Sequence, residues 1–261
     1  MAELTDIHSH LIYGTGDGTA SRDESLSVIR MEYSMGMRHQ FVTPALDSRP
    51  DRETLDVIAE RMRELQSAAA AEFPDLTLHL GYTLKPLFDI AAALREGAPL
   101  TMGGTQYVLI DPACDACGSL GPVFAELLDA GYIPVIAAPE RVKRFRQEPS
   151  VLEGYLRQGA LLSIDIPSIM GLRGKDAMAF ADRLISHRWA SFAASDNRRK
   201  HFESRLFAGY EHIVAKRSKH RADLMLVENG MKLIKGEPVE HDDPEPWTPG
   251  KKTFFGRLFG R

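Results

Sequence analysis

The stretch LTDIHSH, residues 4–10, opens a pattern that repeats through most of this sequence. Its apolar residues are typical of a short buried strand, and a helical pattern follows at 21–36. Further strand candidates occur at regular intervals, namely 39–44, 76–82, 106–111, 133–138, 160–165 and 189–194. The helical patterns between them are 51–73, 86–97, 121–131, 150–159 and 174–188. The chain therefore alternates strand and helix about seven times.

This alternation predicts an α/β fold whose parallel sheet is covered by helices, because its strands are apolar on both faces. Seven units in roughly 200 residues suit a closed or nearly closed barrel better than two separate domains. Two terminal helices are predicted within 203–239. In such barrels the active site lies at the carboxyl ends of the strands, so polar residues there are the first functional candidates.

Composition excludes some classes of function. The chain has 261 residues, 44% of them hydrophobic, which is enough for a full core. A formal charge of −4 argues against a nucleic-acid-binding protein, since such proteins usually carry a net basic footprint. Cys114 and Cys117 form one C-x-x-C pair, which is interpreted as two reduced thiols in a loop rather than a zinc site.

The two ends of the chain differ in character. The start lacks the pattern of a signal peptide, and no apolar run is long enough for a membrane span, so a cytoplasmic protein is expected. We predict one domain at 1–239 and a tail at 240–261. The tail ends in KKTFFGRLFGR, residues 251–261, whose basic and aromatic composition suits an anionic membrane surface or a partner groove. A disordered tail that binds nothing remains the alternative.

Polar side chains at three strand ends are candidates for a metal site. His8 and His10 are one residue apart, so in a strand their side chains point to the same face. The alternative for such a pair is a hydrogen-bonded strand end. Asp111 ends the strand candidate 106–111 and Asp196 follows 189–194. Two imidazoles and two carboxylates at one barrel mouth would suit Zn²⁺, Mn²⁺ or Fe²⁺.

Several segments, in order and over nearly the whole chain, resemble one family. They are DIHSH (6–10), DG (17–18), FVTP (41–44), YVLID (107–111), GYIPVIAAPER (131–141), FAASDN (192–197) and ENGMKLIKGEPV (228–239). They resemble the bacterial protein-tyrosine phosphatases of the polymerase-and-histidinol-phosphatase (PHP) superfamily. These manganese-dependent enzymes of capsular and exopolysaccharide loci dephosphorylate a partner tyrosine kinase. The resemblance implies a distorted seven-stranded β/α barrel, (β/α)7, with a three-metal cluster.

The resemblance also assigns roles to individual residues. The implied metal ligands are His8, His10, Asp17, Asp111 and Asp196. Asp111 stands where the family has a bridging glutamate, and Asp196 is the aspartate of the family's S-D-x-H. Arg141, in APER, matches an arginine that holds the substrate phosphate. Arg141 and Asp196 are therefore the implied catalytic residues.

The sequence departs from the family at other ligand positions. Ala45 and Leu46 replace the two histidines of T-P-H-H, and Thr83 replaces a glutamate. Ala138 replaces the histidine of A-H-P-E-R, and Arg198 replaces the histidine of S-D-x-H. Alanine and leucine have no lone pair, and arginine has only donors, so a full three-metal cluster is not expected.

The surviving ligands leave three expectations open. His8, His10, Asp111 and Asp196 would hold one divalent ion, the site would be empty, or Asp47 or Asp165 would complete a larger site. Arg198 is expected to join Arg141 in binding phosphate, as a guanidinium in place of a metal ligand. The alternative is that NRRK, residues 197–200, is a solvated loop.

Two functional hypotheses follow. The protein is a phosphotyrosine hydrolase with a reduced metal site, or a pseudophosphatase that binds a tyrosine kinase, or its phosphorylated tail, without turnover. Loss of ligands favours the second, and the resemblance favours the first. A sugar-phosphate or histidinol-phosphate phosphatase is a less favoured third hypothesis, because 228–239 resembles the capsular group.

Overall fold

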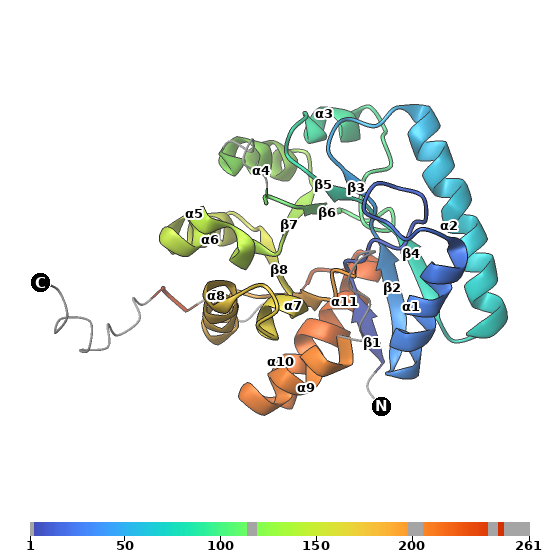
Figure 1. The fold of residues 1–261 in the computed structure, drawn as a ribbon. Coiled ribbons are helices and arrows are strands. Elements are labelled where there is room, and N and C mark those ends of the chain that lie inside the picture. The colour runs from blue at the N-terminus through green and yellow to red at the C-terminus, as the bar shows by residue number, and fades with distance from the viewer. Residues whose placement is uncertain (1–2, 114–118, 198–205, 240–244, 248–261) are drawn as a thin grey trace, which may run out of the picture.

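The computed structural model describes residues 3–113, 119–197, 206–239 and 245–247. Strands lie at the centre, with helices packed around them (Figure 1). The strands are β1 Leu4–Asp6, β2 Met37–Val42, β3 Ala45–Leu46, β4 Thr77–Leu80, β5 Thr83–Leu84, β6 Tyr107–Ile110, β7 Ile133–Ala137, β8 Leu161–Asp165 and β9 Phe192–Ala194. Each predicted strand is thus present, which confirms the α/β class.

Two parallel sheets form the barrel wall. One has the order β1-β2-β4 and the other β3-β5-β6-β7-β8-β9. Short β3 and β5 continue β2 and β4 after a break at Thr43–Pro44 and Gly81–Tyr82. A parallel bridge between Ser9 and Asn197 then joins the chain after β1 to the chain after β9. In the described part of the chain the wall therefore closes as a distorted (β/α)7 barrel, as predicted.

The helices agree with the predicted pattern and its end signals. They are α1 Arg22–Ser34, α2 Arg52–Glu72, α3 Ile90–Arg95, α4 Leu120–Asp129, α5 Lys143–Gln147, α6 Pro149–Arg157, α7 Ile166–Ile169, α8 Lys175–Ser186, α9 Leu206–Lys216, α10 Lys219–Asp223 and α11 Asn229–Lys235. A 3-10 turn, η1, spans Pro139–Arg141, and a π-helical turn, η2, spans Leu224–Glu228. Asp51 illustrates the start signal, because its side chain accepts from the Thr54 amide at the start of α2. The sequence predicts neither short α5 nor short α7. It predicts two terminal helices within 203–239, whereas the described residues of that region form three, α9, α10 and α11, with η2 between the last two.

Two apolar layers hold these elements together. The barrel interior is filled by side chains such as Phe41, Tyr107 and Phe192, and Leu233 of α11 packs against the same cluster. A larger layer lies between the strands and the surrounding helices. The interior is therefore a packed core, and the polar site is confined to the carboxyl ends of the strands.

The described part of the predicted tail contacts the domain. Trp247 packs against Phe180 and Trp189, with ring centroids 5.4 and 5.1 Å away. The Glu245 amide donates to the His187 carbonyl at 2.9 Å. The domain boundary at 239/240 stays a prediction, but residues 245–247 lie on the barrel. The membrane or groove contact predicted for 251–261 falls outside the described residues, as do Cys114 and Cys117. Among the described helices, none has the length and apolar composition needed to cross a membrane.

Candidate metal centre

The two histidines lie just past the first strand. β1 ends at Asp6, so His8 and His10 belong to the extended segment after it rather than to the predicted strand. This segment is hydrogen-bonded to the end of β9: the His10 amide donates to the Asn197 carbonyl at 2.8 Å, and the Asp196 amide to the His8 carbonyl at 3.0 Å. The bridge that closes the barrel therefore also brings Asp196 beside both histidines.

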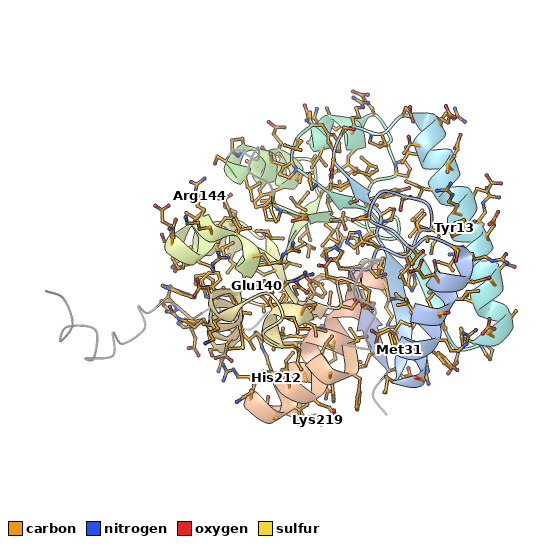
Figure 2. The ribbon with its side chains drawn as sticks, in the orientation of Figure 1. Tyr13, Met31, Glu140, Arg144, His212 and Lys219 are labelled. Atoms are coloured by element: carbon orange, nitrogen blue, oxygen red, sulfur yellow. The ribbon has the colours of Figure 1, made fainter. Side chains whose placement is uncertain are left out.

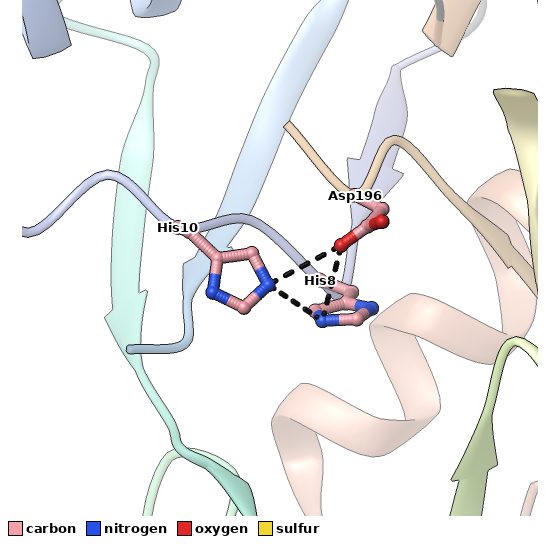
Figure 3. A group of neighbouring side chains, drawn as sticks. All are labelled: His8, His10 and Asp196. Atoms are coloured by element: carbon pink, nitrogen blue, oxygen red, sulfur yellow. Dashed lines mark hydrogen bonds and ion pairs between the residues drawn. The ribbon is translucent and has the colours of Figure 1, made fainter. Parts of the chain in front are cut away.

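Three side chains converge at this junction (Figure 3). The Nε2 atoms of His8 and His10 are 3.0 Å apart. Asp196 Oδ1 lies 3.2 Å from His10 Nε2 and 3.6 Å from His8 Nε2. All three residues are at most 3% exposed. The ligand atoms of two imidazoles and one carboxylate thus face a common point that is shielded from water.

The backbone around Asp196 serves this arrangement. Asp196 has φ 48°, a left-handed conformation that few residues other than glycine adopt. Asp6 holds the segment in place: its Oδ2 accepts from Ser195 Oγ at 2.6 Å, and its Oδ1 from the Ser195 amide at 3.0 Å. Burial raises the pKa of Asp6 to about 6, while its hydrogen bonds with Ser195 act in the opposite direction. Asp6, the last residue of β1, therefore ties this strand to the turn that carries Asp196.

Asp17 lies behind His10 rather than beside Asp196. Its Oδ2 is 2.8 Å from His10 Nδ1, and its side chain is 26% exposed. The negative charge of Asp17 favours a proton on Nδ1, and His10 would then present the lone pair of Nε2 to the junction. This carboxylate–imidazole arrangement is typical of the outer partners that orient metal-binding histidines. Asp17 thus contacts the nitrogen of His10 that faces away from the junction, and its assignment as a ligand, which the resemblance implies, stays a prediction.

The donor set fits one divalent ion. Two neutral imidazole nitrogens and one carboxylate oxygen are the ligand types of many catalytic zinc and manganese sites, which leave a position open for water or substrate. Among the described residues, His8, His10 and Asp196 form the group of three potential ligands whose atoms lie within 4.8 Å of one another. Asp47 and Asp165 are not in that group. Asp47 instead pairs with Lys85 at 2.8 Å.

The other positions singled out in the sequence at the barrel mouth lie outside this group of three, and most of them make local contacts. Asp111 follows β6 and is buried, and its Oδ1 accepts from the Ala113 amide at 2.9 Å. It is not a member of the three-residue group, so its assignment as a ligand stays a prediction. Thr83 Oγ1 donates to the Thr43 carbonyl at 3.1 Å. Ala138 has φ 44° at the end of β7 and supplies no donor atom.

Two arginines approach the second oxygen of Asp196. Arg141 Nη1 lies 3.3 Å from Asp196 Oδ2, and Arg173 Nη2 lies 2.9 Å from the same atom. Arg173 also donates from Nε to Asp165 Oδ2 at 3.0 Å. Arg141 therefore lies beside Asp196, and its contact with a substrate phosphate stays a prediction. Arg198 falls outside the described residues, so its predicted phosphate contact stays a prediction.

A buried pair of carboxyl groups lies beneath these arginines. Glu140 Oε1 accepts from the Asp165 amide at 2.9 Å. Burial, together with the charge on Asp165, raises the pKa of Glu140 to about 8. Burial and the charge on Asp196 raise the pKa of Asp165 to about 7, against the opposing effect of Arg173. Near neutral pH the pair thus carries less negative charge than two ordinary carboxylates would.

Sequence reasoning missed three of these residues. Asp6 is part of the quoted DIHSH, and its position one strand repeat before His8 was a usable signal. Glu140 lies in APER, where only Arg141 was assigned a role. Arg173 had no signal beyond its place between two glycines in GLRG, residues 171–174. It lies between α7 and α8, and its contact with Asp196 joins residues 23 positions apart.

Comparison with known proteins agrees with this geometry. The family model described as capsular polysaccharide synthesis, CpsB/CapC, matches residues 4–235. Tyrosine-protein phosphatase YwqE of Bacillus subtilis is 27% identical over 248 residues, covering 93% of this chain and 96% of that protein. Tyrosine-protein phosphatase CpsB of Streptococcus pneumoniae is 24% identical over 242 residues, covering 88% and 98%.

A solved structure is similar over nearly the whole chain. It comes from crystal structures of YwqE from Bacillus subtilis and CpsB from Streptococcus pneumoniae, described as unique metal-dependent tyrosine phosphatases. The TM-score is 0.84 at 25% sequence identity, and the match covers 94% of this chain and 100% of that chain. The PHP-type barrel and the resemblance to the capsular group are thereby confirmed.

Proposed function

The chain belongs to the capsular polysaccharide synthesis CpsB/CapC family, and we propose that it hydrolyses phosphotyrosine on a partner protein. The observation that carries this proposal is the convergence of His8, His10 and Asp196 on one buried point, with Arg141 beside it. Two of the similar proteins are named tyrosine-protein phosphatases. The partner we propose is a bacterial tyrosine kinase of capsule or exopolysaccharide synthesis, acting in the cytoplasm.

We assign one divalent ion, with manganese as the first candidate, to His8, His10 and Asp196. When bound, this ion would lower the pKa of a coordinated water and neutralise phosphate charge. Asp17 holds the proton on His10 Nδ1 and so keeps Nε2 available as a ligand. Asp111 stays the candidate for a fourth ligand.

The arginines supply the anion-binding half of the site. Arg141 and Arg173 have side chains that are 27% and 24% exposed, so each can reach an incoming phosphate while touching Asp196. Guanidinium groups bind phosphate through paired N–H donors and keep their charge at any physiological pH. Their role is to orient the phosphoryl group against the buried ligands and to stabilise its growing charge.

The test is metal-dependent hydrolysis of a phosphotyrosine peptide. Full-length protein, stripped with a chelator and reloaded with Mn²⁺, Zn²⁺ or Fe²⁺ separately, is expected to release phosphate with at least one ion. His10→Ala removes a ligand and is expected to lower kcat/KM by more than about 100-fold, together with the bound metal. The matched control is His220→Ala, since His220 is an exposed histidine of α10. This variant is expected to keep the wild-type kcat/KM and the bound metal.

Two outcomes would contradict the proposal. Phosphopeptide binding without turnover under all three metals would replace it with the pseudophosphatase role. Turnover that survives His10→Ala would place the chemistry outside this cluster.

A further inference from the structure

Two adjoining clefts extend outward from the arginine side of Asp196. The first, of about 500 Å³, is lined by Arg141 and Arg173, which contact Asp196, and by Arg146 and Lys175. The second, of about 420 Å³, is lined by Lys143, Arg146 and Arg183. Arg146 and Asp176 line both clefts, so the two form one depression between the η1–α5 segment and α8. The cations that line it define the basic groove: Arg141, Lys143, Arg146, Arg173, Lys175 and Arg183.

The charge of the basic groove is opposite in sign to the net charge of the whole chain. Six cations line it, and Asp176 is the acid among its described lining residues. The full sequence has a formal charge of −4. A concave surface of one sign concentrates the local field and attracts ligands of the opposite sign. The groove is therefore a local anion-attracting surface on an acidic protein.

The cations of the basic groove differ in whether they already form ion pairs within the protein. Arg141 and Arg173, at the inner end, are already paired with Asp196. Lys175, in the same cleft, and Lys143, in the second cleft, are exposed, and neither forms an ion pair with another described residue. Ammonium groups on exposed stems remain available to a ligand, at little cost in lost interactions.

The outer end of the groove is bounded by the docked tail segment. The guanidinium of Arg183, a residue of α8, lies over the Trp247 ring, 3.8 Å from the ring centroid. This cation–π contact restrains the position of the guanidinium. Arg146, midway, donates from Nη1 to the Glu140 carbonyl at 2.7 Å and so is anchored beside the catalytic end. Arg146 and Arg183 are thus held in place by these contacts, whereas the Lys143 and Lys175 side chains are exposed.

We propose that the basic groove binds acidic side chains that flank the phosphotyrosine of a peptide substrate. The proposal rests on the proposed function, because it takes the phosphotyrosine to lie at Asp196, where the inner end of the groove begins. Carboxylates spaced along an extended peptide would meet Lys175, Arg146 and Lys143 in turn, from the inner cleft to the outer one. Because the surface is concave, a chain can enter it, whereas a flat lipid surface cannot.

The experiment measures binding with turnover removed. A dye-labelled peptide carries a non-hydrolysable phosphonate analogue of phosphotyrosine, flanked either by glutamates or by glutamines, and fluorescence anisotropy gives Kd for the metal-loaded full chain. The glutamate peptide is expected to bind about five- to tenfold more tightly, with the advantage shrinking as salt is raised. A doubly phosphonylated peptide with glutamine flanks is the third arm.

The key variant is Lys143→Glu with Lys175→Glu, which is expected to remove the preference for glutamate flanks. The matched control is Arg144→Glu with Arg95→Glu, which has the same change in net charge. Arg144 is a neighbour of Lys143 on α5 but lines neither cleft, and Figure 2 shows it at the periphery. Arg95 is exposed at the end of α3. The control is expected to keep the preference.

The outcomes separate this inference from the proposed function. Equal Kd for glutamate and glutamine peptides overturns the groove assignment, even if hydrolysis is observed. A preference that survives in the key variant, or is lost equally in the control, overturns it as well. A tighter complex with the doubly phosphonylated peptide than with the glutamate peptide would overturn carboxylates as the ligand. Glutamate preference without phosphate release would support the groove while contradicting hydrolysis.

Discussion

The two carboxylate oxygens of Asp196 face different kinds of side chain, histidines on one side and arginines on the other. Oδ1 lies 3.2 and 3.6 Å from imidazole nitrogens of His10 and His8, whereas Oδ2 lies within 3.3 Å of the guanidiniums of Arg141 and Arg173. One side offers lone pairs and can hold a cation. The other offers only donors and can hold an anion. A single buried carboxylate thus joins the proposed metal-binding half of the site to the proposed phosphate-binding half.

The two halves also differ in how the fold builds them. The histidine side depends on main-chain hydrogen bonds between neighbouring segments, those after β1 and β9. The arginine side depends on side chains that reach in from η1 and from the segment after α7. Main-chain pairing tolerates little movement, while long side chains can adjust to a ligand. We therefore expect the histidine half to set activity and the arginine half to set affinity for substrate.

The largest effect is expected on the histidine side, from Asp17→Asn. The change removes the charge that holds the His10 Nδ1 proton, so metal affinity should fall by roughly 10- to 100-fold. Competition with a chelating dye would measure it. Asp47→Asn, at an exposed aspartate paired with Lys85, is the control. Unchanged affinity would rule out the orienting role, and a loss as large as that of His10→Ala would make Asp17 a ligand.

A smaller effect is expected on the arginine side, from Arg173→Gln. This change removes a cation that contacts Asp196 and Asp165, so KM for a phosphotyrosine peptide should rise about tenfold while the metal content stays unchanged. Steady-state kinetics and metal analysis give the two readouts. Arg157→Gln, on the exposed face of α6, serves as the control. Loss of metal in Arg173→Gln would mean that the arginine side of Asp196 also determines metal binding on the histidine side.

The smallest effect is expected from Glu140→Gln, beneath the arginine side. The pKa of Glu140 is raised from 4.5 to about 8, so the folded state resists its ionisation. The associated stability is fully present below about 4.5 and is lost as pH rises toward about 8. The wild-type free energy of unfolding should therefore fall more steeply over this range than that of Glu140→Gln, by up to about 1.4 kcal/mol per pH unit.

Urea unfolding at several pH values would measure this difference. Glu126→Gln, an exposed glutamate of α4, should follow the wild-type curve. Parallel curves for wild type and Glu140→Gln would show that the ionisation of Glu140 is not what makes stability depend on pH.

Much of the fold follows from local patterns in the sequence. The order of strands and helices was predictable because apolar runs and helix end signals act over a few neighbouring residues, as with the Asp51 cap of α2. The exceptions were short elements. Helices α5 and α7, of five and four residues, are too short to show helical periodicity and depend on packing against the barrel.

The candidate site was predictable only in part. His8, His10 and Asp196 could be chosen because strand ends of a parallel barrel meet at one mouth. Their convergence on Nε2 and Oδ1 depends on the left-handed turn at Asp196 and on its hydrogen bond to His8. Sequence spacing gives no information on such turns, nor on the position of Asp17 behind His10.

By itself, the sequence determined the β/α order, the family and the chemical types available at the barrel mouth. Those properties are encoded in each residue and its near neighbours. Only the tertiary structure decided that Asp17 approaches the far side of His10, that Asp6 ties Ser195 to the first strand, and that Arg173 contacts Asp196. The physical reason is that the Asp6–Ser195 and Arg173–Asp196 contacts join segments far apart in the sequence, which closure of the barrel brings together. The Asp17–His10 contact depends on the path of the turn between β1 and α1, which residue spacing alone does not give.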